Sequence, residues 1–239
     1  MNARASITEA TALPFDIDGD AARAFDVLAG GGIAIVPNDI GYSILGGSPA
    51  ALQRIFQTKK RSPQKLNAMV ANMATHRRLH RCSDRGAAIV DTICLGYDLP
   101  LGCIAPYRSD HPMMERLSAE VLQGSTKGDT LVMLLNAGRF HGALTELSER
   151  DNLALFGSSA NVTLGGTKFR VEDIEPEILN IADIVIDHGL QRYHPYGSSS
   201  TLLNVETMEV VRHGSCFEDI AYILKRHFDV ALAPRPGGK

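Results

Sequence analysis

The sequence predicts an α/β protein with a twisted mixed sheet and helices packed around it. Short apolar runs rich in β-branched residues alternate with stretches of helical periodicity along the chain. Near the carboxyl end, "STLLNVETMEVVRHG" contains two such runs joined by a tight turn at Glu206 and Thr207, which predicts an antiparallel pair and hence a mixed sheet. With 239 residues, 44% of them hydrophobic, the chain is long enough to bury one substantial core.

The same patterns predict the elements in chain order. The run "GIAIVP" at 32–37 predicts a strand, "PAALQRIFQTKK" at 49–60 a helix, and "LNAMVAN" at 66–72 a second strand. In "FEDIAYILKRHF", at 217–228, the apolar residues fall along one helical face. Further strands are expected at 101–105, 130–135, 153–156, 184–186, 201–204 and 209–212, and further helices at 84–97 and 171–180.

These elements are expected to form a single domain over residues 1–239, with its core at about 20–228. The end of the chain, at about 230–239, is expected to be a flexible tail. Its last seven residues, "APRPGGK", contain two prolines and two glycines, a composition that disfavours a packed element.

Charge and hydropathy limit the possible partners. The formal net charge of -3 provides no overall basic field, so nucleic-acid binding would require a local patch. "KKR" at 59–61 and "HRRLHR" at 76–81 are candidates for such a patch, and both are equally typical of a solvated helix surface. The sequence contains neither a signal-peptide core nor an apolar run approaching the ~20 residues of a membrane span, which predicts a cytoplasmic protein without a membrane partner.

Cysteine and histidine spacing predicts no metal site. The four cysteines form no C-x-x-C pair, so we expect reduced, structural thiols. His76 and His80 would share a helix face, but the intervening "RRL" brings positive charge and lacks the glutamate of H-E-x-x-H.

Several polar stretches are candidates for binding an anion, although neither standard glycine-rich phosphate motif is present. Lys59 and Arg61 lie at the end of a predicted helix and can direct two cations at one anion. "SSAN" at 158–161 follows a predicted strand, and "GSSST" at 197–201 precedes one; small hydroxyl and amide groups there suit a phosphate or carboxylate, or simply a turn. Arg212 ends a strand, where its charge requires a partner.

The order of five stretches resembles the YrdC-like family of threonylcarbamoyl-AMP synthases. They are "PNDIGYSI" at 37–44, "KKRSPQKL" at 59–66, "SSAN" at 158–161, "SSTLLN" at 199–204 and "VVRHG" at 210–214. The corresponding family stretches read P-T-D-T-x-Y-G-L, K-x-R-P-x-x-K-P-L, [ST]-S-A-N, S-T-V-V-D and R-x-G. Each is short, but five in order are jointly specific.

The resemblance implies a YrdC-like fold with a large basic cavity and a nucleotidyltransferase activity. ATP, bicarbonate and threonine would be joined to threonylcarbamoyl-adenylate with release of pyrophosphate, for threonylcarbamoyladenosine modification of tRNA. ATP would be a substrate, accompanied by magnesium, and tRNA or double-stranded RNA would be a further partner. By position, the resemblance implies Lys59 and Arg61 as catalytic residues. The implied nucleotide- and substrate-binding residues are Asn38, Tyr42, Lys65, Ser159, Asn161, Ser200, Thr201 and Arg212.

Departures from the family pattern leave the identity of the amine substrate undetermined. Asn38 and Ile40 replace the two threonines of the first stretch, so another small amine is an alternative to threonine. The central strand, "TLVMLLNAGRF", lacks the family's arginine and proline, for which Arg139 is a shifted substitute. The other hypothesis is a non-catalytic module of the same fold that binds RNA or nucleotide without turnover.

Overall fold

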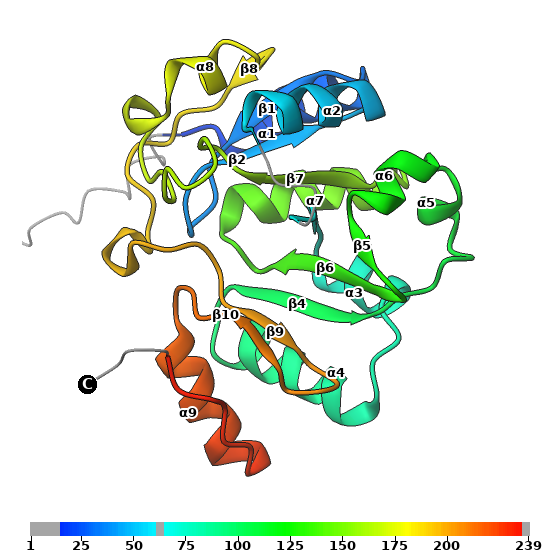
Figure 1. Ribbon diagram of the computed structural model, residues 1–239, viewed down its shortest axis with the longest axis vertical. Helices are drawn as coiled ribbons and strands as arrows, with labels where there is room; N and C mark the ends of the chain where they lie inside the picture. The colour runs from blue at the N-terminus through cyan, green and yellow to red at the C-terminus, as the bar shows by residue number, and fades with distance from the viewer. Residues whose placement is uncertain (1–14, 61–64, 236–239) are drawn as a thin grey trace, which may run out of the picture.

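A computed structural model of the chain describes residues 15–60 and 65–235 (Figure 1). The predicted mixed sheet is confirmed: its strands lie in the order β10-β9-β4-β6-β3-β7-β2-β1-β8, with β5 paired to β6. The pairs β1·β8, β3·β6 and β4·β9 are parallel and the others antiparallel. The expected antiparallel pair near the carboxyl end is β9·β10.

The strands are β1 (Ile33–Val36), β2 (Ser43–Gly46), β3 (Ala68–Val70), β4 (Leu101–Pro106), β5 (Thr126–Lys127), β6 (Thr130–Leu135), β7 (Leu155–Ser159), β8 (Ile184–Val185), β9 (Leu202–Asn204) and β10 (Val210–Arg212). The helices are α1 (Ile17–Ala29), α2 (Pro49–Thr58), α3 (Met73–Leu79), α4 (Asp84–Asp91), α5 (Pro112–Glu115), α6 (Ala119–Gln123), α7 (Arg139–Arg150), α8 (Pro176–Leu179) and α9 (Phe217–Phe228). A π-helical turn, η1 (Thr92–Gly96), continues α4, and η2 (Val171–Asp173) and η3 (His194–Tyr196) are 3₁₀ turns. Among the described helices, none combines the length and apolar character needed to cross a bilayer.

The two faces of the sheet have different roles because side chains alternate along each strand. Met69, Cys103 and Phe156 point into the main hydrophobic core, which also receives buried side chains of α2, α4 and α9. The neighbouring positions on the same strands, among them Val70 and Ile104, face the other way and line a cavity. One face of the sheet therefore provides the main core, while the other provides the floor of a binding space and, at Val70 and Leu134, part of a second hydrophobic cluster.

Helices α1 and α7 pack beside the sheet in a second hydrophobic cluster. Ala24, Phe25 and Leu28 of α1 are buried there with Phe140 and Leu144 of α7. The sequence analysis predicted neither helix, nor β2, β5, α5 or α6, and it considered α3 only through the helical spacing of His76 and His80. These segments are short or interrupted by charge, so their periodicity identifies them less clearly than the long apolar runs.

Two predicted helices have different forms from those expected. The helix expected at 171–180 is divided into η2 and α8 because Pro176 disfavours helical backbone at Glu175, which is extended at φ -60°, ψ 137°. The helix expected at 84–97 changes to π-helix at Thr92. In the predicted tail, residues 230–235 have no helix or strand, and Arg235 Nε donates to Glu218 Oε1 at 3.2 Å; residues 236–239 lie outside the described residues.

Candidate functional site

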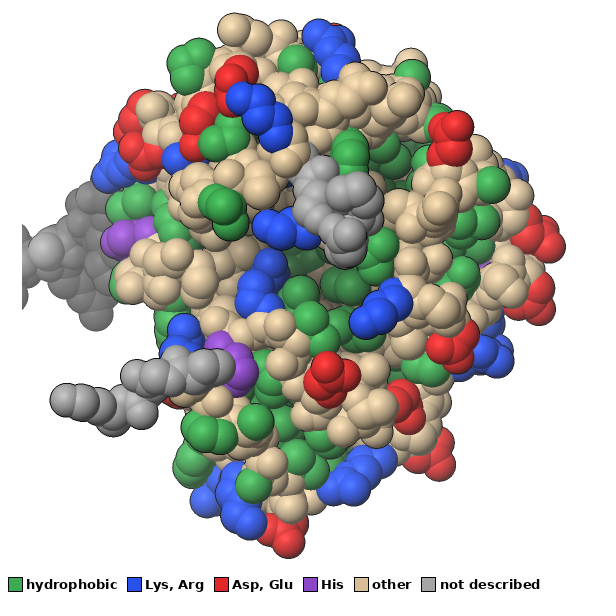
Figure 2. Space-filling view, viewed as in Figure 1, with side chains coloured by type: hydrophobic (Ala, Val, Ile, Leu, Met, Phe, Trp, Pro, Cys, Tyr) green, Lys and Arg blue, Asp and Glu red, His purple; other side chains and the backbone are tan. Residues whose placement is uncertain are grey.

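A cavity of about 820 Å³ opens on the face of the sheet opposite the main core. Figure 2 shows hydrophobic side chains inside the hollow and Lys and Arg side chains around it. The floor includes Val70, Ile104, Val132 and Leu134. The cationic side chains among the described lining residues are Lys59, Lys65, Lys127 and Arg212, and the carboxylate is Glu209. A positive potential across the whole cavity stays a prediction.

The loop after β7 forms one polar wall of this cavity. Antiparallel pairing with β2 places Ser159 opposite Ser43, and both residues line the cavity. Ser159 Oγ donates to Asn161 Oδ1, and Asn161 Nδ2 donates to the Val162 carbonyl. At Gly157 a Cβ would lie 2.1 Å from the Ile44 carbonyl oxygen, so this strand position requires glycine. Local hydrogen bonds thus orient the loop before any ligand binds.

Lys59 connects the end of α2 to this loop. Its side chain is buried, with Nζ donating to the carbonyl oxygens of Ser159 and Asn161. Its own carbonyl accepts from Thr163 Oγ1 at 2.6 Å and from Thr163 N at 3.1 Å. Lys59 therefore positions the loop and places a positive charge in the cavity wall.

Ser158, the first residue of "SSAN", also lines the cavity. Its Oγ is buried and has no hydrogen-bond partner among the described residues. An unsatisfied buried hydroxyl costs about 1–3 kcal/mol, and such groups mark places where a ligand or ordered water donates or accepts. The sequence analysis included Ser158 in the candidate stretch "SSAN", but the family resemblance selected only Ser159 and Asn161, and the two serine hydroxyls are distinguished only by their hydrogen bonds in the fold.

Arg212 borders the cavity from β10. Its Nε donates to the Ser200 carbonyl at 2.9 Å, and its Nη2 donates to Ser200 Oγ at 3.2 Å. The side chain is exposed to the cavity, yet surrounding protein restricts hydration, and this desolvation lowers the pKa of Arg212 to about 10. Within the described part of the chain, no carboxylate lies within 4.0 Å of its guanidinium. Arg212 is therefore charged at neutral pH and available to an anion.

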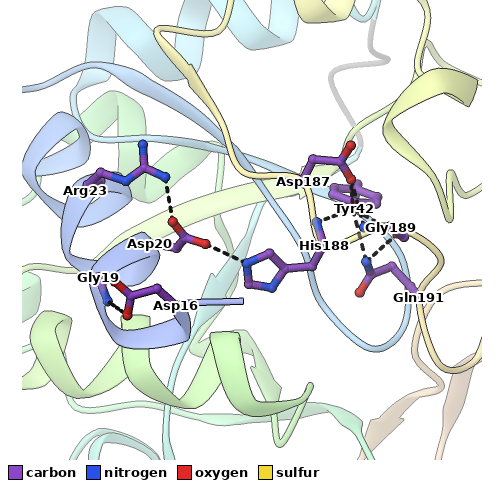
Figure 3. A network of polar contacts seen from close by, with 9 residues as sticks. All are labelled: Asp16, Gly19, Asp20, Arg23, Tyr42, Asp187, His188, Gly189 and Gln191. Carbon is purple, nitrogen blue, oxygen red and sulfur yellow. Dashed lines mark hydrogen bonds and ion pairs between the residues drawn. The ribbon is translucent and has the colours of Figure 1, made fainter. Parts of the chain in front are cut away.

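Tyr42 is placed away from the cavity, in a network shown in Figure 3. Its fully buried ring brings the hydroxyl oxygen to 3.0 Å from Asp187 Oδ1 and 2.9 Å from the Gly189 carbonyl. The same oxygen accepts from His188 N at 3.0 Å and from Gln191 Nε2 at 3.1 Å. Burial raises the pKa of Tyr42 well above its usual range, which keeps the hydroxyl protonated. The Tyr42 hydroxyl is therefore engaged with protein groups, and the residue has a structural role rather than lining the cavity.

Three other residues selected from the sequence are also off the cavity lining. Thr201 is fully buried, and its hydroxyl donates to the Ser215 carbonyl at 2.9 Å. Asn38 donates to Ser43 Oγ at 2.7 Å and itself lines a second cavity of about 550 Å³. Arg139 lines that second cavity too, so it is not a substitute for the missing strand arginine. Arg61 lies outside the described residues.

The cavity thus brings together Lys59, Lys65, Ser159, Asn161, Ser200 and Arg212 from separate parts of the chain. It adds Lys127, Thr130 and Glu209, which sequence reasoning missed. None of the three was selected as a binding residue, although Thr130 begins "TLVMLLNAGRF" and Glu209 lies in "STLLNVETMEVVRHG", because their shared location arises only when β5, β6 and the β9–β10 turn are assembled.

A mixed sheet with cations and small polar loops around an open cavity defines an α/β protein with a candidate small-ligand site. The chain belongs to the Sua5/YciO/YrdC family: the family model, described as "Telomere recombination", matches residues 26–214. A search of curated proteins found no match.

Solved structures share the fold. A hypothetical protein from Streptococcus mutans UA159 is 20% identical, with a TM-score of 0.72 over 88% of this chain and 92% of its own. Sua5 from P. abyssi, solved with L-threonine, is 19% identical, with a TM-score of 0.71 over 93% of this chain and 61% of that one. E. coli YciO is 18% identical, with a TM-score of 0.60 over 83% of this chain and 92% of its own.

Proposed function

We propose that the protein is a carbamoyl-adenylate synthase of the L-threonylcarbamoyladenylate type, which joins ATP, bicarbonate and a small amino acid. The observation that carries this proposal is the convergence of Lys59, Ser159, Asn161 and Arg212 on one cavity of about 820 Å³. A cavity of this size is in the range that accommodates a nucleotide, and its cations suit the triphosphate.

The proposed chemistry requires positioning rather than a covalent nucleophile. The amine adds to bicarbonate to give a carbamate with loss of water, a carbamate oxygen attacks the α-phosphorus of ATP, and pyrophosphate leaves. Arg212 and Lys65 hold anionic oxygens. Arg61 is assigned the same role from the sequence motif alone. Lys59 adds positive charge to the wall, while Ser158 and Ser200 provide hydroxyl groups to the nucleotide. Magnesium enters bound to the ATP phosphates, as is usual for this ion.

Family membership and the L-threonine named with P. abyssi Sua5 support an amino acid as the third substrate. The product would then be used in threonylcarbamoyladenosine modification of tRNA. The apolar floor and Ile40 in the lining suit an amino acid with a small or aliphatic side chain.

The alternative, an RNA-binding module without turnover, depended partly on "HRRLHR". Arg77 Nη2 lies 2.9 Å from Asp91 Oδ1, and Arg78 Nη2 lies 3.0 Å from Glu149 Oε1. His76 and His80 are buried. Much of that segment is therefore ion-paired or inside the protein, which weakens the argument that it forms a basic RNA-binding patch.

The test is pyrophosphate release from ATP in the presence of bicarbonate and a panel of amino acids, with the adenylate product identified by mass. Turnover that requires all three substrates supports the proposal. Retained ATP binding with no turnover for any amine, together with a salt-dependent gel shift of tRNA, would favour the binding module.

A further inference from the structure

Three side chains able to bind a metal meet in the main core, away from the cavity lining. They are His76 and His80 of the α3 segment and Cys103 of β4, all buried, with their ligand atoms within 4.8 Å of one another. His76 Nδ1 and His80 Nδ1 are 2.9 Å apart, and Cys103 Sγ is 3.8 Å from His80 Nδ1.

The structure overturns the charge argument against these histidines. Arg77 and Arg78 point away to Asp91 and Glu149, so their charges are paired at the surface while the imidazoles face inward. The helical spacing that brings His76 and His80 together also separates them from the intervening arginines.

The protonation pattern places the lone pair of His80 Nδ1 inside the cluster. His80 Nε2 lies 3.2 Å from the Leu131 carbonyl oxygen, which can only accept, so Nε2 carries the hydrogen and the lone pair of His80 Nδ1 accepts from His76 Nδ1 at 2.9 Å. Burial lowers the pKa of His76 to about 4 and that of His80 to about 3, so both rings are neutral at physiological pH. A backbone carbonyl that fixes the outer nitrogen is also the usual support of a metal-binding histidine.

We propose that His76 Nδ1, His80 Nδ1 and Cys103 Sγ form a site for a soft monovalent cation, Cu⁺. Thiolate and imidazole ligands suit soft d¹⁰ ions. Two neutral imidazoles, one thiolate and Cu⁺ give a complex with no net charge, whereas Zn²⁺ would leave one buried positive charge, which is costly in a core. Binding releases the Cys103 thiol proton to solvent, and His76 moves its hydrogen to Nε2; no oxidation step is involved.

Two of the three distances between ligand atoms can be compared with this coordination, and the third pair, His76 and Cys103, lies within 4.8 Å. With bonds of about 2.1 Å to nitrogen and 2.3 Å to sulfur, a trigonal angle separates nitrogen from sulfur by about 3.8 Å. The Cys103 Sγ–His80 Nδ1 distance of 3.8 Å already has this value. The two nitrogens, now at the 2.9 Å of a hydrogen bond, must separate to about 3.6 Å, a movement that rotation of one ring can supply.

The test uses the full chain, reduced and metal-free, under anaerobic conditions. Cu⁺ is titrated in competition with a chromophoric Cu⁺ chelator, and the loaded protein is examined by X-ray absorption. We expect one equivalent to bind, with one sulfur and two nitrogen neighbours. Cys103→Ala should weaken the binding at least a hundredfold, whereas Cys94→Ala, which removes another buried thiol outside the cluster, should leave it unchanged.

Three results would overturn the site: no competitive uptake by the folded wild-type chain, a sulfur-only environment, or full affinity in Cys103→Ala. Because the X-ray measurement is made on the unaltered chain, it decides the question even if a variant does not fold. Stable Zn²⁺ binding without Cu⁺ uptake would overturn the assignment of a monovalent ion. None of these results depends on the proposed synthase activity.

Discussion

Lys59 at the end of α2 donates from its ammonium to the carbonyl of Asn161, a residue 102 positions later in the chain. A charged donor and a backbone acceptor thus join a helix end to the loop that forms one cavity wall. When the chain folds and this contact forms, it also fixes the loop that lines the candidate site.

Replacing Lys59 with Met keeps most of the side-chain volume and removes the ammonium. The loop carbonyls lose a charged donor, so we expect a loss of about 1.5–3 kcal/mol in the free energy of unfolding, measured in urea, together with loss of pyrophosphate release. Lys60→Met is the matched control, because Lys60 is the exposed neighbour and does not line the cavity. Equal stability of the two variants would contradict the role given to Lys59.

Arg212→Ala should weaken ATP binding by about 1.5–3 kcal/mol, or roughly 10- to 150-fold, because it removes a charged donor that faces the cavity. Calorimetric titration measures the change. Arg226→Ala, an exposed arginine of α9, is the control and should bind ATP like the wild type. Unchanged ATP affinity in a folded Arg212→Ala protein would show that the nucleotide does not bind at the Arg212 side of the cavity.

The amine preference should be relaxed relative to a site built for a hydroxyl-bearing substrate. Ile40 lines the cavity with an apolar group, and the amide of Asn38 donates to Ser43 Oγ. We expect threonine to be used no more than about tenfold better than serine or valine, since apolar pockets discriminate weakly between such side chains. Initial rates of pyrophosphate release across the panel measure it. A preference for threonine of several orders of magnitude would refute the expectation.

Tyr42→Phe distinguishes a structural from a ligand-binding role. Removing the hydroxyl leaves Asp187, the His188 amide and Gln191 without a shared partner, so stability should fall by about 1–3 kcal/mol. ATP affinity should be unchanged because Tyr42 does not line the cavity. Tyr222→Phe, at an exposed tyrosine, controls for the substitution itself. A selective loss of ATP binding at normal stability would restore the role implied by the family pattern.

Much of the fold was predictable because apolar alternation and helical periodicity are local signals. Strands such as β4 and β6, each paired with a neighbouring strand on both edges, were predicted at nearly their full length. The helix α1 was missed although Asp16 caps it, with Oδ1 accepting from Gly19 N at 3.1 Å. Its sequence, "IDGDAARAFDVLA", has a glycine and three aspartates, which weaken the helical signal in the sequence. The helix is stabilised instead by packing on α7.

The site was predictable only in part, for a different reason. Motifs identified residues near the cavity, but the direction of each side chain depends on strand register and on competing hydrogen bonds. Ser200 and Thr201 are adjacent in sequence, yet Ser200 lines the cavity while Thr201 points behind it to Ser215. Likewise, Ser158 gains its distinctive unpaired hydroxyl only from the folded surroundings.

The floor of the cavity and the main core come from alternate positions of the same strands, Val70 beside Met69 and Ile104 beside Cys103. A substitution at Ile104 changes the shape offered to a ligand while Cys103 keeps its contacts in the main core, whereas Val70 also packs in the second hydrophobic cluster. At floor positions such as Ile104, the shape of the cavity can therefore change during evolution while the main core is retained. This division gives a physical reason why chains with only 18–20% identity retain one architecture, and why a new preference can evolve without a new scaffold.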